Sequence, residues 1–275
     1  MKKAKTARRP RKAEIYASHG VQYNAKTEKI LAPVFGWIKP LLINGNEKLG
    51  KGVYTFSTLA GSRDYTCNID GVEWTERGTC SGNCAGCYAQ AGRYVFESVV
   101  RCNLVKTYLS RHYPDFVKSA ILAQLEADRV ELCRIHASGE FFDAAYISIW
   151  HDIAAAAPDT LFWSYTKNPA AENAFSDLSN INIVKSVIRG FGFNYGKCGY
   201  ILRVYAALTA AGEQVYICRC GVDPSQHCTN CAGCAKNKYV LFLEHGTGYK
   251  AESDPLYSKV KEIIDAQAQA LRVAA

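Results

Sequence analysis

The sequence predicts an α/β protein with mainly parallel strands, and three observations support this prediction. Strand-like and helix-like stretches alternate from about residue 114 onward, as crossover units require. Of the 275 residues, 48% are hydrophobic and 21% are charged, which is enough apolar mass for one sizeable core. The apolar runs stay far below the roughly 18 residues of a membrane-spanning helix. This composition excludes a mostly disordered chain and predicts no membrane association.

The first fourteen residues differ in composition from the rest. They carry seven Lys or Arg side chains against Glu14 alone, so +6 of the formal net charge of +8 lies there. Because so basic a segment cannot bury enough apolar surface to fold, residues 1–14 are predicted to be a flexible tail. Two interpretations stay open: an arm attracted to the phosphates of a nucleic acid, and a solvated tail that aids solubility. The first thirty residues also lack the apolar core of a secretory signal, which favours a cytoplasmic location.

The elements follow in order along the chain. Turn signals at Asn44-Gly45 and at 50–52 lead into a first strand at 53–56. The clearer pattern begins at Pro114, a residue favoured in the first turn of a helix, and a second helix is expected after the N-cap Asp143. The later predicted strands are 132–137, 161–166, 181–188 and 214–217, and the later predicted helices are 170–178, 199–211 and the amphipathic stretch after Asp254.

Twelve cysteines are spread along the chain, and several of them are clustered. A reducing cytosol disfavours disulfides, and clustered cytosolic cysteines indicate metal. The first cluster is the C-x3-C-x2-C triple formed by Cys80, Cys84 and Cys87, whose thiolates can converge on one metal centre. Structural zinc takes four protein ligands, whereas three cysteines on a four-iron cluster leave one iron open to a small molecule.

The triple resembles the cluster-binding loop of the radical S-adenosylmethionine superfamily. This resemblance implies a partial (β/α) barrel, a [4Fe-4S] cluster on Cys80, Cys84 and Cys87, and S-adenosyl-L-methionine bound at the open iron, where its reductive cleavage yields a carbon-centred radical. The chain departs from the superfamily at Gly86, because an aromatic residue usually precedes the third cysteine.

A second motif agrees with this resemblance. Ser138, Gly139 and Glu140 directly follow a predicted strand and resemble the superfamily's Gly-Gly-Glu motif, whose backbone and carboxylate meet the ammonium group of the cofactor. Lys167 and Asn168 follow the next strand and therefore fall on the same rim. They are expected to contact the carboxylate of the cofactor or the substrate.

A closer resemblance covers most of residues 44–235. The segments 45–51, 79–80, 87–89, 134–142 and 165–168 resemble the phage gene-product-eighty-eight family. That family implies a radical-cofactor-like fold carried by phages and mobile elements, and it brings no known substrate. For a phage-encoded chain, the expected location becomes the cytoplasm of the host.

A second cysteine group lies between residues 218 and 234. Its C-x2-C-x2-C run with an upstream cysteine is typical of iron–sulfur loops, and Cys218-x-Cys220 is too tight for one knuckle of a zinc ribbon. We therefore expect an auxiliary [4Fe-4S] cluster, with zinc as the alternative. The expected ligands are Cys220, Cys228, Cys231 and Cys234. Cys218 is an alternative to Cys220, on the argument that adjacent strand residues point to opposite faces and only one of the two would face the metal.

The remaining candidate residues favour structural roles. Cys133 is expected in the core, Cys102 and Cys198 are expected to be free thiols, and the role of Cys67 stays open. His136 is expected to be a buried, satisfied histidine.

These observations predict four regions: the tail 1–14, an α/β core at 15–217 with the cluster loop 80–87, an auxiliary metal loop at 218–236, and a C-terminal strand and helix at 237–275. On the resemblance, the function is that of a radical S-adenosylmethionine-type enzyme, which draws electrons from a flavodoxin or ferredoxin and modifies an unknown substrate. The basic tail favours a nucleotide or nucleic acid as that substrate. Two alternatives stay open: a zinc-stabilised nucleic-acid-binding protein without enzymatic activity, and a degenerate relative without activity.

Overall fold

Four parallel strands form the centre of the structure, a computed structural model that describes residues 10–24, 26, 29, 30, 32, 39–45, 49–81, 87–186, 195–223, 226–231, 233–243 and 250–273. They belong to a five-stranded sheet with the order β3-β4-β7-β8-β9, in which β3 pairs antiparallel with β4. The strands are β3 (Ile43–Asn44), β4 (Val53–Phe56), β7 (Leu132–Ile135), β8 (Leu161–Thr166) and β9 (Ile181–Lys185). The α/β class and the parallel strands are therefore confirmed, and the described strands do not close into a barrel.

The carboxyl ends of the parallel strands lie along one edge of this sheet because their registers match. Phe56 pairs with Ile135, and Thr166 pairs with Lys185. Three helices connect the strands: α3 (Pro114–Asp128) leads into β7, α4 (Ala144–Ala156) joins β7 to β8, and α5 (Pro169–Asn173) joins β8 to β9. The predicted cap of α4 is confirmed, since the Asp143 carboxylate accepts a hydrogen bond from Tyr146 N at 2.7 Å.

Several boundaries differ from the prediction. Strand β7 ends at Ile135, because His136 takes a left-handed φ of 59° and Ala137 N donates to Phe56 O at 3.1 Å. Helix α5 stops at Asn173 rather than at residue 178. The last two residues of the predicted strand 181–188 lie outside the described residues.

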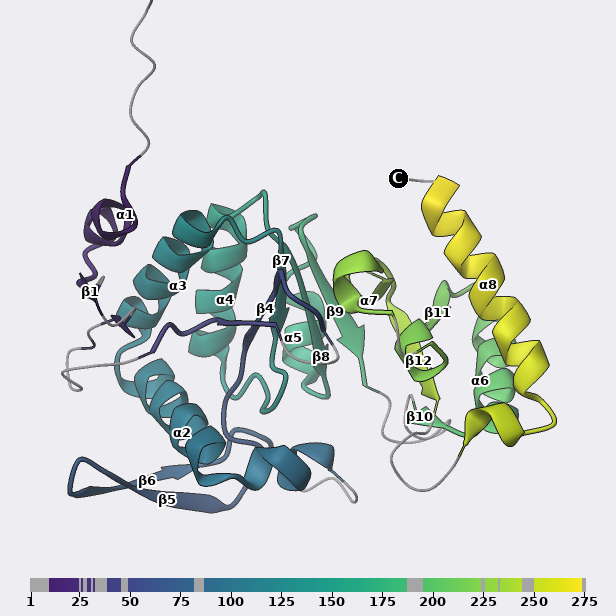
Figure 1. Ribbon diagram of the computed structural model, residues 1–275, viewed down its shortest axis with the longest axis horizontal. Helices are drawn as coiled ribbons and strands as arrows, with labels where there is room; N and C mark the ends of the chain where they lie inside the picture. The colour runs from purple at the N-terminus through teal and green to yellow at the C-terminus, as the bar shows by residue number, and fades with distance from the viewer. Residues whose placement is uncertain are drawn as a thin grey trace, which may run out of the picture.

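The two faces of the sheet are covered by different parts of the chain, since side chains alternate along each strand. On one face, Phe56, Ile135 and Phe162 belong to the main hydrophobic cluster, which also contains Trp150 of α4. On the other face, Trp163 packs in a separate cluster with residues of the C-terminal cysteine loop. Figure 1 shows α3 and α4 on one side of the sheet and α7 (Gly233–Lys236) on the other.

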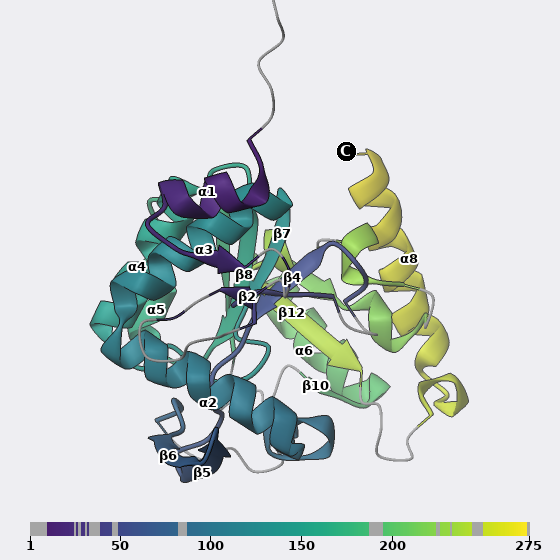
Figure 2. The ribbon, with the colours of Figure 1, turned by 60° about the vertical axis from the view of Figure 1, so that its left-hand side comes forward.

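A second, three-stranded sheet contains β10 (Tyr195–Gly196), β12 (Tyr239–Leu243) and β11 (Val215–Ile217) in that order, all parallel. Helices α6 (Cys198–Ala210) and α8 (Tyr257–Val273) pack with it around Ile201, Leu241 and Val260 (Figure 2). The predicted helix 199–211, strand 214–217 and C-terminal helix are thus confirmed with small shifts in their ends.

Several elements were not predicted. Helix α2 (Glu97–His112) and the hairpin of β5 (Asp64–Ile69) and β6 (Val72–Arg77) lie together below the central sheet in Figure 1. Near the N-terminus are α1 (Lys12–Ser18), β1 (Tyr23–Asn24) and β2 (Lys29–Ile30), and short 3-10 turns are η1 (Tyr88–Gln90), η2 (Gly92–Val95), η3 (Arg219–Gly221), η4 (Cys228–Asn230) and η5 (Ala251–Ser253). Helix α1 begins inside the predicted tail, where Lys12 pairs with Asp128 at 2.8 Å, while residues 1–9 lie outside the described residues. In the part of the chain that the structure describes, no helix is long and apolar enough to cross a membrane.

Candidate functional site

The loops that follow β4 and β7 are joined at the carboxyl edge of the central sheet. Thr58 N donates to Ser138 O at 3.0 Å, and the Ser138 hydroxyl donates to Thr58 O at 2.9 Å. Asn103 of α2 donates its side-chain amide to Ser138 Oγ at 3.2 Å. Ser138, predicted to support the cofactor, therefore fixes the two loops to each other and to α2.

Gly139 occupies a position that only glycine fits. Its φ is +87°, and a Cβ at this residue would overlap Thr58 Oγ1 and lie 2.9 Å from Thr79 Oγ1. The absence of a side chain therefore lets the backbone before Glu140 approach the threonine that precedes the first cysteine.

The cysteine triple begins directly beside this loop. Thr79 Oγ1 accepts a hydrogen bond from Glu140 N at 2.9 Å and donates to Leu59 O at 2.9 Å. The next residue, Cys80, donates its backbone N–H to Gly61 O at 3.0 Å, and its Sγ accepts from Gly61 N at 3.2 Å. The first cysteine of the triple, Cys80, thus directly follows Thr79, the residue that contacts Glu140.

The rest of the triple is described in part. Cys84 lies outside the described residues, together with its neighbours from 82 to 86. Cys87 is half-buried, and its carbonyl accepts from Gln90 N at 3.0 Å. The segment that follows returns to the end of β7, because the Tyr94 hydroxyl donates to Ala137 O at 3.2 Å.

Glu140 is a buried carboxylate, only 8% exposed, with three donors around it. Its Oε1 accepts from Phe141 N at 2.9 Å and from the Thr166 hydroxyl at 2.6 Å, and its Oε2 accepts from Lys167 N at 2.8 Å. Burial raises the pKa of Glu140, and these hydrogen bonds and the charge of Lys167 partly oppose that rise. The predicted rim is thereby formed, since the ends of β7 and β8 meet at this carboxylate.

Asn168 has a structural role beside this carboxylate. Its Oδ1 accepts from Ala170 N at 3.0 Å and so caps α5, while its Nδ2 donates to Phe141 O at 2.9 Å. Lys167 contributes its backbone N–H to Glu140. Both residues thus lie on the rim as predicted.

Helix α2 contributes polar residues to this edge that sequence reasoning missed. Thr107 Oγ1 accepts from Leu59 N at 3.0 Å, and the Lys106 ammonium lies 5.4 Å from the centre of the Phe56 ring while the residue is only 3% exposed. The signal was a polar stripe at helical spacing, formed by Asn103, Lys106, Thr107 and Ser110.

His136 is buried, as predicted, but its hydrogen bonding is only half satisfied, contrary to the prediction. Its Nε2 lies 2.9 Å from the Tyr146 hydroxyl, whereas its Nδ1 has no hydrogen-bond partner. Burial, assisted by the charge of Arg134, lowers the pKa of His136 to about 3. The ring is therefore neutral at physiological pH.

The second cysteine group is gathered in one place by β11, η3, η4 and α7. Cys218 and Cys234 are buried in one hydrophobic cluster with Tyr216, and Cys220, Cys228 and Cys231 pack against it. Both Cys218 and Cys220 thus belong to the group, although the alternation argument admitted only one of them. That argument fails because β11 ends at Ile217 and the chain turns into η3, and because residues two apart on a strand would in any case share a face.

Cys231 belongs to the same cluster, and its Sγ is 2.8 Å from the Tyr216 hydroxyl. In the described ranges, however, no three His, Cys, Asp or Glu side chains stand ready-made around a metal position. The donor set itself consists of soft sulfur atoms, which suits zinc or iron–sulfur clusters.

The cysteine loop is fastened to the central sheet and to the segment before β4. Thr229 N donates to Leu49 O at 3.3 Å, and the Thr229 hydroxyl donates to Lys51 O at 2.9 Å. Asn182 of β9 donates its amide to Cys234 O and to Asn237 O, both at 2.8 Å. The cysteine loop is therefore held against the central sheet.

The cysteines without ligand spacing lie in other surroundings. Cys133 and Cys198 are fully buried in two different hydrophobic clusters, and Cys67 is buried in β5. Burial raises the pKa of both Cys67 and Cys133, so these thiols resist conversion to the thiolate form that binds metals. Cys102 is half-buried on α2.

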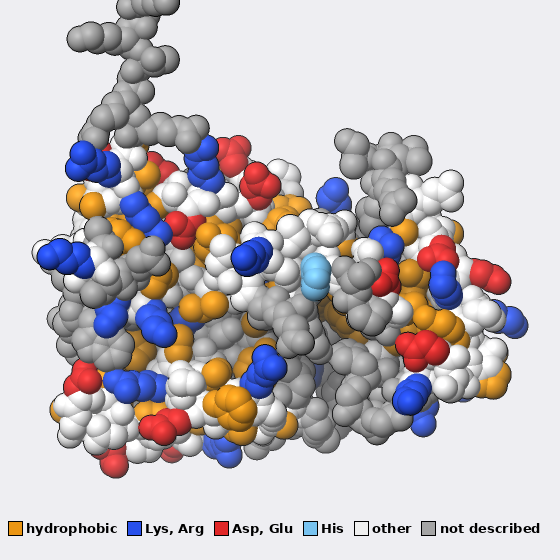
Figure 3. All heavy atoms as spheres, in the orientation of Figure 1, with side chains coloured by type: hydrophobic (Ala, Val, Ile, Leu, Met, Phe, Trp, Pro, Cys, Tyr) orange, Lys and Arg blue, Asp and Glu red, His pale blue; other side chains and the backbone are white. Residues whose placement is uncertain are grey.

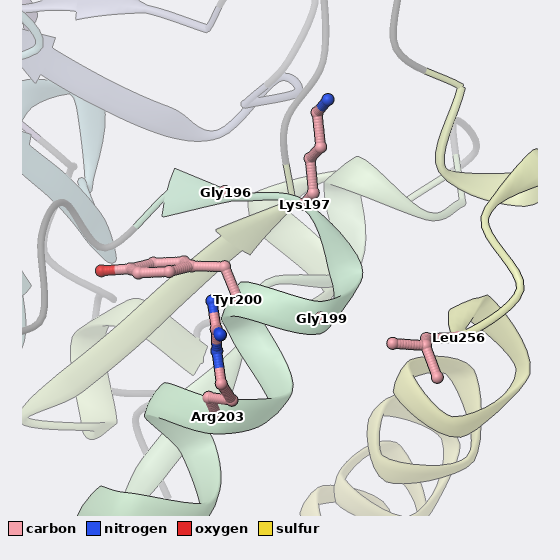
Figure 4. Close-up of a pocket in the computed structure, with 6 residues that line it drawn as sticks. All are labelled: Gly196, Lys197, Gly199, Tyr200, Arg203 and Leu256. Atoms are coloured by element: carbon pink, nitrogen blue, oxygen red, sulfur yellow. The ribbon is translucent and has the colours of Figure 1, made fainter.

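A surface cavity of about 630 Å³ opens at the start of α6. It is lined by Gly196, Lys197, Gly199, Tyr200, Arg203 and Leu256. In Figure 4, the side chains of Lys197 and Tyr200 leave the helix in different directions and do not converge on a common point. None of the predicted site residues lines this cavity, which therefore stands apart from both cysteine groups.

Basic side chains are spread over the face seen in Figure 3, with acidic side chains between them. The described atoms of this face therefore form no concentrated basic patch of the kind that would favour the expected nucleic-acid partner. The basic leader behind that expectation falls mostly on residues 1–9, outside the described residues.

Comparison with known proteins identifies a family. A family model described as Gene product 88 matches residues 40–192, more than half of the 275-residue chain. No curated protein and no solved structure matches the chain. The matched range contains the Cys80 triple and Glu140 and ends before Cys218.

Proposed function

We propose that this chain, which belongs to the Gene product 88 family, is an iron–sulfur protein of the radical S-adenosylmethionine type. One observation carries the proposal: Thr79, which precedes the first cysteine, accepts the backbone hydrogen bond of Glu140 at 2.9 Å. That bond connects the root of a three-cysteine loop to a buried carboxylate at the carboxyl edge of a parallel sheet, where α/β proteins bind their ligands.

Cys80, Cys84 and Cys87 would hold a [4Fe-4S] cluster. Soft thiolates suit iron, and three of them leave one iron free to bind a cofactor. Cys80 is already oriented by the hydrogen bond that its Sγ accepts from Gly61 N. The chemistry that such a cluster supplies, once bound, is the one-electron reduction of the cofactor's sulfonium centre.

Glu140 would orient the ammonium group of S-adenosyl-L-methionine. Its Oε1 already accepts two hydrogen bonds, whereas its Oε2 accepts one, from Lys167 N, among the described contacts. One acceptor position on Oε2 is thus left for a further donor. The buried position strengthens a charge-assisted hydrogen bond there, since little water competes.

We also propose an electron donor and a class of substrate. A flavodoxin or ferredoxin fits the need for single electrons. A nucleotide or nucleic acid is favoured only by the basic N-terminal residues.

Anaerobic purification tests the cluster. The expected product is brown, with about four irons and four sulfides per chain, and its electron paramagnetic resonance spectrum after reduction changes when S-adenosyl-L-methionine is added. Cys84→Ala is expected to abolish that signal and reductive cofactor cleavage. Cys102→Ala is the control, because Cys102 is a half-buried cysteine of α2 that has no ligand spacing. A colourless protein that carries zinc at the first triple would overturn the proposal.

Glu140→Gln tests the orientation of the cofactor. The variant is expected to keep the cluster signal, while the cofactor concentration needed for the spectral change rises about 10-fold to 100-fold, as the loss of a charge-assisted hydrogen bond implies. Unchanged cofactor affinity would contradict the role of the carboxylate.

A further inference from the structure

Helix α2 carries a buried positive charge that no acceptor in the described part of the chain satisfies. Lys106 is only 3% exposed, and its ammonium group makes no hydrogen bond or ion pair with another described residue. The ammonium lies 5.4 Å from the centre of the Phe56 ring. A ring face offsets only part of the cost of burying a charge, and a buried lysine is normally paired with an anion. The Lys106 ammonium therefore suits an anionic group that a ligand supplies.

The same face of α2 holds a second polar group of this kind. Ser110 follows Lys106 by four residues, which places both on one face of the helix. Ser110 is 4% exposed, and its Oγ has no hydrogen-bond partner among the described atoms. Buried polar groups are rarely left unsatisfied in native proteins, so two neighbours in this condition indicate a missing partner.

The charge of Lys106 lies at the edge of the sheet that carries the candidate site. Phe56, whose ring the ammonium approaches, is the last residue of β4. Lys106 also lies one turn after Asn103, which donates to Ser138 Oγ at 3.2 Å. Because helical side chains lean toward the N-terminus of their helix, a lysine at this position extends toward the turn of Asn103. Lys106 is thus next to the loop that carries Glu140.

We propose that Lys106 binds the carboxylate of the amino-acid moiety of S-adenosyl-L-methionine, while Glu140 binds its ammonium. This inference rests on the proposed function. Both charged groups of an α-amino acid are attached to one carbon atom, so the cofactor needs a cation close to the carboxylate that holds its ammonium. Lys106 and Glu140 are enclosed to a similar degree, at 3% and 8% exposure, and carry groups of opposite charge. The side chain of Asn168, which was expected to contact the cofactor or the substrate, is already bonded to Ala170 N and Phe141 O.

Two ligands separate the carboxylate from the rest of the cofactor. They are S-adenosyl-L-methionine and its decarboxylated analogue, which keeps the ammonium and the sulfonium, and anaerobic equilibrium dialysis against the full chain measures the affinity for each. Lys106→Met should weaken binding of S-adenosyl-L-methionine about 10-fold to 100-fold, as the loss of a charge-assisted hydrogen bond implies, and leave binding of the analogue unchanged. Lys118→Met, which removes a lysine paired with Asp152 on the neighbouring helices, is the control and should bind both ligands like the wild type.

The outcomes against the proposal are specific. Equal weakening of both ligands by Lys106→Met, or of neither, would overturn it. So would a selective loss of the carboxylate-bearing ligand in Lys167→Met but not in Lys106→Met, since Lys167 follows the neighbouring strand β8 on the same rim.

The stability of the ligand-free protein distinguishes a binding role from a structural one. Because an unpaired buried charge disfavours the folded state, Lys106→Met should unfold at the same urea concentration as the wild type or at a higher one. A lower midpoint would contradict the unpaired charge on which the proposal depends.

Iron and sulfide analysis of the same samples separates this proposal from the proposed function. A wild type that holds the cluster but binds both ligands equally would refute the role of Lys106 alone. A wild type without iron that still prefers S-adenosyl-L-methionine, and loses this preference in Lys106→Met, would refute the radical chemistry alone. Binding of neither ligand would refute both.

Discussion

Replacement of Gly139 by alanine should destabilise the protein in two separable ways. The residue has a φ of +87°, which costs an L-residue about 1–2 kcal/mol. The new methyl group would also meet Thr58 and Thr79, whose hydroxyls are buried and hydrogen-bonded, so neither can move aside without losing a bond. Overpacking of this kind adds about 1–3 kcal/mol. The expected loss of unfolding free energy is therefore about 2–5 kcal/mol.

A matched control separates the two effects. Gly212 has a similar φ of +78°, and a Cβ there would find no atom within 4 Å. Gly212→Ala should therefore lose only the backbone contribution of about 1–2 kcal/mol. Urea denaturation at pH 7, followed by tryptophan fluorescence and circular dichroism, measures both variants. Equal losses for the two variants would refute the close packing of Gly139 against the threonines.

Three further predictions concern pH and the C-terminal loop. The pKa of His136 is lowered from its ordinary 6.5 to about 3, so the stability that the neutral ring contributes above pH 6.5 is lost as the pH falls. Urea titrations should therefore show that, between pH 7 and pH 4, the wild type loses about 3 kcal/mol more unfolding free energy than His136→Asn. The raised pKa of Glu140 acts in the opposite direction, because the folded state holds the proton more tightly than the unfolded state. The free energy of unfolding should therefore fall as the pH rises from the ordinary carboxyl range through the raised pKa, and Glu140→Gln should lack this pH dependence. Asn182→Ala and Asn180→Ala each remove an amide that donates to backbone carbonyls and should each cost about 1–3 kcal/mol. Only Asn182→Ala should make the thiols of the C-terminal loop react faster with Ellman's reagent, and equal reaction rates would contradict the docking described for Cys234.

The elements that could be predicted are those in which local sequence and burial agree. Helix α4 combines a capping Asp143 with an apolar stripe through Ile147, Trp150 and Ile153, and the structure buries that stripe. Helix α2 was missed because its inward face is polar: Asn103 and Thr107 hydrogen-bond with the loops after β4 and β7 instead of packing in an apolar core. Hydrophobic periodicity does not detect such a face.

The hairpin of β5 and β6 shows a signal that was available. Asp70-Gly71, a dipeptide typical of tight hairpin turns, forms its turn, with φ values of 54° and 86°. The flanking residues are mostly exposed, so their hydrophobic pattern is weak.

The candidate site could be predicted only in part. Parallel-strand logic correctly places Glu140 and Lys167 on the same rim, because both follow strands whose carboxyl ends align. The hydrogen bond between Glu140 and Thr79 joins positions 61 residues apart and has no local signal. Likewise, the place of Cys218 among the thiols depends on the end of β11 and the turn of η3, which spacing alone does not reveal.

The docking of Thr229 on Leu49 joins residues 180 positions apart, so this part of the fold can form only late in synthesis. A ribosome releases the amino-terminal part first, and domains generally fold as they emerge. The sheet face that carries Val53, Trp163 and Val184 therefore stays exposed until Tyr216, Cys234 and Val240, which cover it, have been translated. During that interval the nascent chain exposes an apolar surface. A product truncated before residue 216 would expose this surface permanently and would therefore bind chaperones or aggregate.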